Sequence, residues 1–171
     1  MSSGTLHTLG LVVVNTLFVT LFVFRSPAKA ESESLGLWVL GIAGTVLPLL
    51  MRPSDEALLE RTGDILQIVG LALLALALLS LRRSFGIVAA NRGVRSGGLY
   101  RFVRHPIYFA ELTLILGVAL ANSTSANLLI WLCECALQYA RARAEEQLLC
   151  ADPAYQSYLT RVRYRLVPGL I

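Results

Sequence analysis

The residues most able to do chemistry lie between Gly97 and Tyr108, in the segment GGLYRFVRHPIY. The segment places a histidine, two tyrosines and two arginines between apolar stretches of the chain. Pro106 suits the first position of a helix, which puts His105 at or near the N-cap, beside unpaired backbone N–H groups and the positive end of the helix dipole. This environment disfavours an imidazolium, so we expect a neutral His105 that can accept or donate one proton.

A second polar cluster, RARAEE at positions 141–146, follows the last apolar run. At 100° per residue, Glu134, Gln138, Arg141 and Glu145 fall on one face of a helix. An ionisable residue such as Glu134 within an apolar span is costly and is functional by default. We therefore expect this stripe to face a cavity or another helix, with a plain i,i+4 ion pair between Arg141 and Glu145 as the alternative.

Glu111 stands one turn beyond Tyr108 on the preceding predicted helix. Its carboxyl group either pairs with an arginine such as Arg104 or lines a pocket for a substrate or cofactor. Apolar surroundings demand a partner in both cases. Both interpretations stay open at this point.

Metal chemistry and nucleic-acid binding receive no support from the sequence. Cys133 and Cys135 are two apart on a predicted helix and point in different directions, so we expect neither a metal site nor a disulfide. The glycines at 93, 97 and 98 form a flexible loop without the dinucleotide-binding pattern. The net charge of +4 comes without a nucleic-acid-binding motif and is better explained by membrane topology.

The composition predicts an all-α, multi-pass integral membrane protein that forms a single domain over residues 1–171. Hydrophobic residues make up 56% and charged residues 15%, against about 25% charged residues in soluble domains. We read the first apolar run as a retained helix rather than a signal peptide, because no basic region precedes it. The predicted transmembrane helices are Leu6–Phe24, Leu35–Met51, Ile65–Leu81, Ile107–Ala121 and Ala126–Tyr139.

The arginines predict the orientation. Residues 82–104 contain six arginines and no acid, and further arginines follow the fifth span, so these two segments are expected in the cytosol. The N-terminus is then outside and the C-terminus inside, in a membrane that is most simply the bacterial cytoplasmic membrane. The last two spans form a hairpin with Ser125 as N-cap. A cytosolic amphipathic helix begins at Asp152 and Pro153, carries apolar residues as far as Leu166, and is ended by Pro168-Gly169.

These motifs together resemble the isoprenylcysteine carboxyl methyltransferase family. The shared features are GLYRFVRHPIY at 98–108, a helical hairpin, RARAEE at 141–146, DPAYQSY at 152–158 and RLVP at 165–168. That family and the related phospholipid N-methyltransferases are integral membrane enzymes that use S-adenosylmethionine. The resemblance covers residues 82–171, which would form the methyltransferase core, and leaves three spans in residues 1–81.

The resemblance implies a cofactor site and a catalytic set. His105, Glu111 and Arg141 are the candidate catalytic residues, and which of Arg141 and Arg143, and of Glu145 and Glu146, meets the cofactor stays open. The implied cofactor contacts are Val94, Arg95, Gly98, Leu99, Tyr100, His105, Pro106, Tyr108, Arg143, Glu145 and Glu146.

The chemistry of the cofactor suits these residue types. Tyrosine rings attract a sulfonium, a glutamate binds an ammonium or ribose hydroxyl, and an arginine binds a carboxylate. The acceptor would be a lipid or a lipid-modified molecule that enters from the bilayer. An isoprenylcysteine-type carboxylate is the first expectation, and a phospholipid amine or a lipid phenol or polyketide is the alternative. A membrane transporter or scaffold, with Glu111 and Glu134 as a polar relay, is the non-enzymatic alternative, and an NADPH-using reductase is a further one. The sequence does not indicate an oligomeric state.

Overall fold

The computed structural model describes residues 35–54, 59–81 and 94–170, together with Thr16, Val19, Thr20, Val23, Phe24, Ala30, Glu31, Ala90 and Asn91. Most of the first predicted span, Leu6–Phe24, lies outside this part of the chain. The elements in order are β1 (Ala30–Glu31), α2 (Leu35–Val46), the 3-10 helix η1 (Leu47–Leu50), α3 (Glu60–Leu81), β2 (Ala90–Asn91), the 3-10 helix η3 (Gly98–Arg101), α4 (Pro106–Ala121), α5 (Ser125–Leu149) and α6 (Pro153–Arg161).

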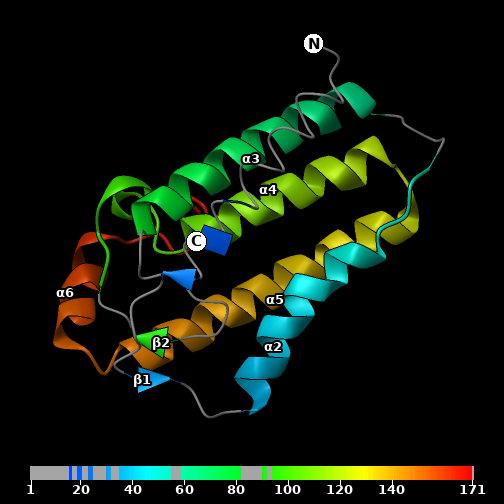
Figure 1. The fold of residues 1–171 in the computed structure, drawn as a ribbon. Helices are drawn as coiled ribbons and strands as arrows, with labels where there is room; N and C mark the ends of the chain where they lie inside the picture. Colours follow the sequence, from blue (N-terminus) through cyan, green and yellow to red (C-terminus); the bar gives the residue numbers. More distant parts are fainter. Residues whose placement is uncertain are drawn as a thin grey trace.

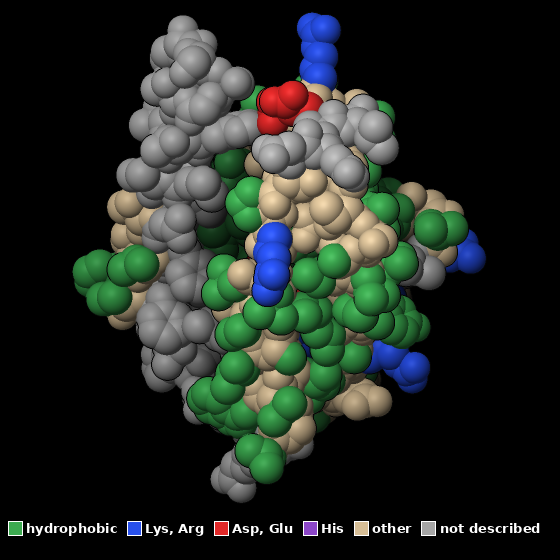
Figure 2. Space-filling view, turned by 90° about the vertical axis from the view of Figure 1, so that its right-hand side faces the viewer, with side chains coloured by type: hydrophobic (Ala, Val, Ile, Leu, Met, Phe, Trp, Pro, Cys, Tyr) green, Lys and Arg blue, Asp and Glu red, His purple; other side chains and the backbone are tan. Residues whose placement is uncertain are grey.

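The described fold is helical, as predicted, and its long helices lie side by side (Figure 1). One short antiparallel pair, β1 with β2, was not predicted. The helix α3 is long and apolar enough to cross a membrane, whereas α4 and the α2–η1 segment are apolar but shorter. Hydrophobic side chains cover much of the described surface in Figure 2. The five-span membrane arrangement therefore remains a prediction.

Glycines bring α3 and α4 into close backbone contact. A Cβ added at Gly70 would lie 2.6 Å from the backbone nitrogen of Leu114, and one added at Gly117 would lie 2.7 Å from that of Gln67. Only residues without a side chain permit such an approach. Because the two helices pack along their lengths, the end of α3 is held beside the start of α4.

The hairpin between α4 and α5 starts its second helix one residue earlier than predicted. Thr124, not Ser125, is the N-cap, and its hydroxyl accepts a hydrogen bond from the Asn127 backbone nitrogen at 3.1 Å. The helix α5 then continues to Leu149, beyond the predicted membrane span Ala126–Tyr139, and it includes Arg141 and Glu145 as the predicted polar stripe requires. The polar residues from Arg141 to Glu146 therefore lie on the same helix as Glu134.

The C-terminal helix begins as predicted but ends early. Asp152 caps α6 by accepting from the Ala154 backbone nitrogen at 2.9 Å, and the helix stops at Arg161 instead of continuing to Leu166. The segment after α6 instead pairs with the segment before α4, where Tyr164 and Val103 form a parallel bridge. The backbone N–H of His105 donates to the Arg165 carbonyl at 2.9 Å. Buried N–H groups at this point need acceptors, and an extended segment supplies them.

Candidate functional site

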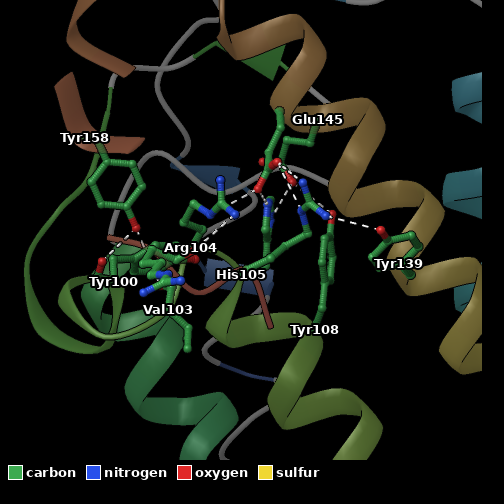
Figure 3. A network of polar contacts seen from close by, with 11 residues as sticks. Tyr100, Val103, Arg104, His105, Tyr108, Tyr139, Glu145 and Tyr158 are labelled. Carbon is green, nitrogen blue, oxygen red and sulfur yellow. Dashed lines mark hydrogen bonds and ion pairs between the residues drawn. The ribbon is translucent and has the colours of Figure 1, made fainter. Parts of the chain in front are cut away.

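Three segments far apart in sequence meet at one end of the bundle. The start of α4 brings His105 and Tyr108, the last turns of α5 bring the glutamate pair, and the segment after α6 brings Arg165. Figure 3 shows His105 and Tyr108 side by side, with Glu145 close to both. The two polar clusters predicted from the sequence therefore form one site.

His105 lies between two carboxylates. Its Nδ1 is 3.4 Å from Glu145 Oε2, and its Nε2 is 3.2 Å from Glu146 Oε1. His105 is the N-cap of α4, as predicted, although its side chain makes no capping hydrogen bond. A neutral imidazole can donate from one nitrogen only, whereas an imidazolium can donate to both acids.

The surroundings of His105 therefore favour the imidazolium, which is opposite to the predicted preference for a neutral ring. Burial alone lowers the pKa of His105, but hydrogen bonds and charge interactions with Glu145 and Glu146 raise it above 6.5 overall. The reciprocal effect acts on Glu146. Burial raises the pKa of its carboxyl group, but His105, Arg165 and Arg104 outweigh burial and lower the pKa to about 2. The two carboxylates thus raise the pKa of His105 by more than the helix dipole lowers it.

This pairing predicts how stability depends on pH. Because the pKa of His105 is raised in the folded state, its contribution is fully present below pH 6.5 and is lost as pH rises through the folded-state pKa. Glu146 contributes above its unfolded-state pKa of 4.5, and that contribution is lost as pH falls toward 2. We expect the unfolding midpoint of the wild type to fall from pH 6 to pH 8 more steeply than that of His105→Gln. Thermal unfolding of both proteins across this range measures the difference, and parallel curves would contradict the assignment.

Glu146 is held by two arginines as well as by His105. Arg165 donates to its Oε2 from Nη2 at 2.8 Å and from Nε at 3.0 Å, and Arg104 Nε forms an ion pair with its Oε1 at 3.3 Å. Neither arginine was predicted as a site residue. Arg165 lies in the RLVP motif that contributed to the resemblance, and this motif was the one available signal. Arg104 was proposed as a partner of Glu111, but its carboxylate partner is Glu146.

Tyr108 connects this cluster to Arg141. The Tyr108 hydroxyl donates to Glu145 Oε2 at 3.1 Å, its ring stacks on His105 with centroids 5.4 Å apart, and the Arg141 guanidinium lies 4.9 Å from the ring centroid. The Tyr108 ring therefore already accepts a cation against its face. Of the two arginines on α5, Arg141 reaches the site, and Arg143 is exposed.

Glu111 belongs to a deeper group on the facing sides of α4 and α5. The Gln138 amide nitrogen donates to Glu111 Oε2 at 2.9 Å and to Glu134 Oε1 at 2.8 Å. Arg141 Nη1 donates to Gln138 Oε1 at 3.0 Å, which joins this group to Tyr108. The predicted polar stripe on α5 thus faces another helix.

The helix α6 supports the segment before α4. The buried Tyr158 hydroxyl donates to the Tyr100 carbonyl at 2.6 Å, and Val94 packs against Tyr155, Tyr158 and Val162. Burial, followed by nearby acids and tyrosines, raises the pKa of Tyr100 well above 10, so its hydroxyl stays protonated. This helix therefore fixes the backbone that leads into His105.

The remaining residues that were predicted to contact the cofactor lie in the segment supported by α6, and not in the cluster around His105 and Glu146. Gly98 has φ of +59°, and a Cβ there would overlap the Ser80 hydroxyl at the end of α3. The Leu99 backbone nitrogen donates to that same hydroxyl at 3.4 Å. Pro106 is buried at the first position of α4, and Arg95 is exposed. These residues shape the entry to α4 instead of joining the charged cluster.

Comparison with known proteins gives one match of broad coverage. Residues 61–152, more than half of the chain, match the model of the phospholipid methyltransferase family. None of the curated proteins matches the chain significantly. The matched region contains His105, Tyr108, Arg141 and both site glutamates, and it ends before Arg165. The predicted relationship to phospholipid methyltransferases is confirmed, whereas the narrower resemblance to isoprenylcysteine carboxyl methyltransferases stays a prediction. The chain belongs to the phospholipid methyltransferase family.

Proposed function

We propose that this protein transfers a methyl group from S-adenosylmethionine to a lipid-borne acceptor at the end of the helix bundle. The observation that carries the proposal is the convergence of Tyr108, His105, Arg141 and the two glutamates within the region matched by a methyltransferase family.

The donor set fits the charged parts of the cofactor. S-adenosylmethionine supplies a methyl group on a positively charged sulfur. The Tyr108 ring, which accepts the Arg141 guanidinium, is suited to a sulfonium. Arg141 and Arg104 are suited to the amino-acid carboxylate, and Glu145 is suited to the ammonium or a ribose hydroxyl. Glu146 is already bound by His105 and Arg165, so we assign it to positioning the site rather than to the cofactor.

Two acceptor classes are compatible with this site. The family match and the acids at 111 and 134 favour a phospholipid amine, because carboxylates attract an ammonium group. The motif resemblance favours an isoprenylcysteine-type carboxylate, which needs no base before methyl transfer. We place the amine first, since two glutamates beside the site would repel an acidic acceptor.

The membrane arrangement completes the proposal. Residues 1–81 would form three spans and residues 82–171 the methyltransferase core, with the site end of the bundle in the cytosol. The acceptor would enter from the bilayer and the cofactor from the cytosol. The arginine-rich segment at 82–104 and the apolar surface of the helices support this orientation.

Calorimetric titration of the purified protein with S-adenosylhomocysteine tests the proposal. We expect binding in the wild type, and about 2- to 10-fold weaker binding for Tyr108→Phe, which loses the hydrogen bond to Glu145. A folded wild-type protein that binds no S-adenosylhomocysteine would contradict the proposal and leave the transporter or scaffold hypothesis. Labelled S-adenosylmethionine with a phospholipid amine and a prenylcysteine acceptor then separates the two acceptor classes.

A further inference from the structure

His105, Tyr108, Glu145 and Glu146 form the cluster that we propose to bind the cofactor, here called the cofactor cluster. That role does not explain the group formed by Glu111, Glu134 and Gln138. It lies deeper along α4 and α5, one helical turn beyond Tyr108, and its two carboxylates share one amide nitrogen. Arg141 connects it to Tyr108. The group is therefore next to the cofactor cluster and distinct from it.

Glu134 has an unsatisfied oxygen. Its side chain is fully buried, its Oε1 accepts from Gln138, and its Oε2 has no hydrogen-bond partner among the described residues. A buried carboxylate oxygen without a donor is costly, and a bound cation or a catalytic role is among the reasons for which native structures retain one. This oxygen points to a missing positive group.

The charges around the group lead to the same conclusion. Arg141 is the cation that faces Glu111 and Glu134 from α5. It also lies close enough to Glu145 to interact electrostatically with that carboxylate. The described part of α2 carries no titratable side chain. The charged residues of α3 are Glu60, Arg61 and Asp64. They lie around Gly63, which packs against Gly117 and Ala121 at the end of α4 that is far from Glu111.

The structure also removes the other candidate base. Both ring nitrogens of His105 face carboxylate oxygens, at 3.4 and 3.2 Å, so neither nitrogen is directed toward an incoming acceptor. Glu111 is only partly buried, and one of its oxygens is engaged by Gln138. It is therefore the carboxylate of this group that an incoming molecule can reach.

We propose that the Glu111–Gln138–Glu134 group binds the ammonium group of the acceptor and that Glu111 takes its proton. This inference rests on the proposed function and adds the residues that select and activate the acceptor. One ammonium N–H bond breaks, its proton passes to the Glu111 carboxylate, and the nitrogen keeps the electron pair with which it can accept a methyl group. Glu134 is a positioning residue, since it acts on the ammonium charge from the buried side of Gln138.

Binding of a cationic amphiphile without cofactor tests the site directly. Decyltrimethylammonium carries a fixed positive charge and no transferable proton, and its binding in maltoside micelles is measured by the rise in unfolding temperature. We expect binding in the wild type and about tenfold or greater weakening in Glu111→Gln and Glu134→Gln, because a charged partner is lost. Glu60→Gln, an exposed acid on α3, is the control and should bind as the wild type does.

The proton transfer has its own readout. Loss of a general base reduces turnover by about 10²- to 10⁴-fold, so Glu111→Gln should lose this much activity toward a phospholipid amine at pH 7. A lipid amine has a pKa of about 10, so the free amine increases roughly tenfold per pH unit below that value. The turnover of Glu111→Gln should therefore recover with rising pH more steeply than that of the wild type. A residue with only a structural role would not produce this recovery.

The outcomes separate this inference from the proposed function. Each variant is first shown to unfold cooperatively and to bind S-adenosylhomocysteine as the wild type does. Amphiphile binding and turnover within twofold of the wild type in both glutamine variants would overturn the inference and leave the proposed function standing. Amphiphile binding that depends on Glu134, in a wild-type protein that does not bind S-adenosylhomocysteine, would support the cation site and overturn the proposed function together with the proton transfer.

Discussion

Glu146→Gln is expected to destabilise the protein by about 3–5 kcal/mol and to abolish S-adenosylhomocysteine binding, because removing one partner of a buried charge network leaves the others uncompensated. Arg165, Arg104 and His105 all lose their shared negative charge at this position. The backbone of the C-terminal segment is held to the chain before α4, so a disturbance of Arg165 reaches His105. Thermal unfolding and calorimetric titration measure the two effects.

The matched control is Arg143→Gln. Arg143 lies on the same helix within one turn of Glu146, but its side chain is exposed. Its substitution should change stability by no more than about 0.5 kcal/mol and should leave S-adenosylhomocysteine binding intact. Equal losses in the two variants would contradict the view that Glu146 is the central anion of the site.

Arg141→Ala should weaken S-adenosylhomocysteine binding about 10- to 100-fold, the range expected for losing a hydrogen bond to a charged group. Arg141 is the residue through which the cofactor cluster and the Glu111–Gln138–Glu134 group are connected. Arg141→Lys should restore little of the affinity, since a compact ammonium cannot both lie over the Tyr108 ring and donate to Gln138 as the larger guanidinium does.

Arg101→Ala provides the comparison for Arg141. The Arg101 guanidinium also lies over an aromatic ring, 4.6 Å from the centroid of Phe102, but both side chains are exposed. We expect unchanged calorimetric affinity in this variant. Full recovery of affinity in Arg141→Lys would show that only a positive charge is needed, and it would refute the bridging role of the guanidinium.

Much of the fold could be predicted because helices and their starts depend on local sequence. The apolar runs beginning at Leu35 and ending at Leu81 and Ala121 marked helix boundaries that the structure reproduces. Pro106 and Pro153 marked two helix starts, since proline suits the first position where no N–H partner is needed. The helical character of the chain follows from these patterns alone.

A helix end that depends on tertiary partners was placed wrongly. The apolar period predicted that α6 would reach Leu166, but it ends at Arg161 because the next residues pair with the chain before α4. Hydropathy ended the predicted span of α5 at Tyr139, whereas helical spacing correctly carried the same helix on to Glu145. Hydropathy reports which residues avoid water and says nothing about which distant segments supply their partners.

The candidate site divides in the same way. Residue types and spacing identified His105 as a candidate site residue, and the family resemblance implied roles for Tyr108 and the glutamate pair. Helical periodicity placed Glu134, Gln138 and Arg141 on one face. The tertiary structure decided which charges meet. It placed both glutamates beside His105, where they favour its protonated form. It also paired Glu146 with Arg165 and left one oxygen of Glu134 without a hydrogen-bond partner among the described residues. Protonation and partner choice depend on distances between segments that are remote in the chain, and no local pattern contains those distances.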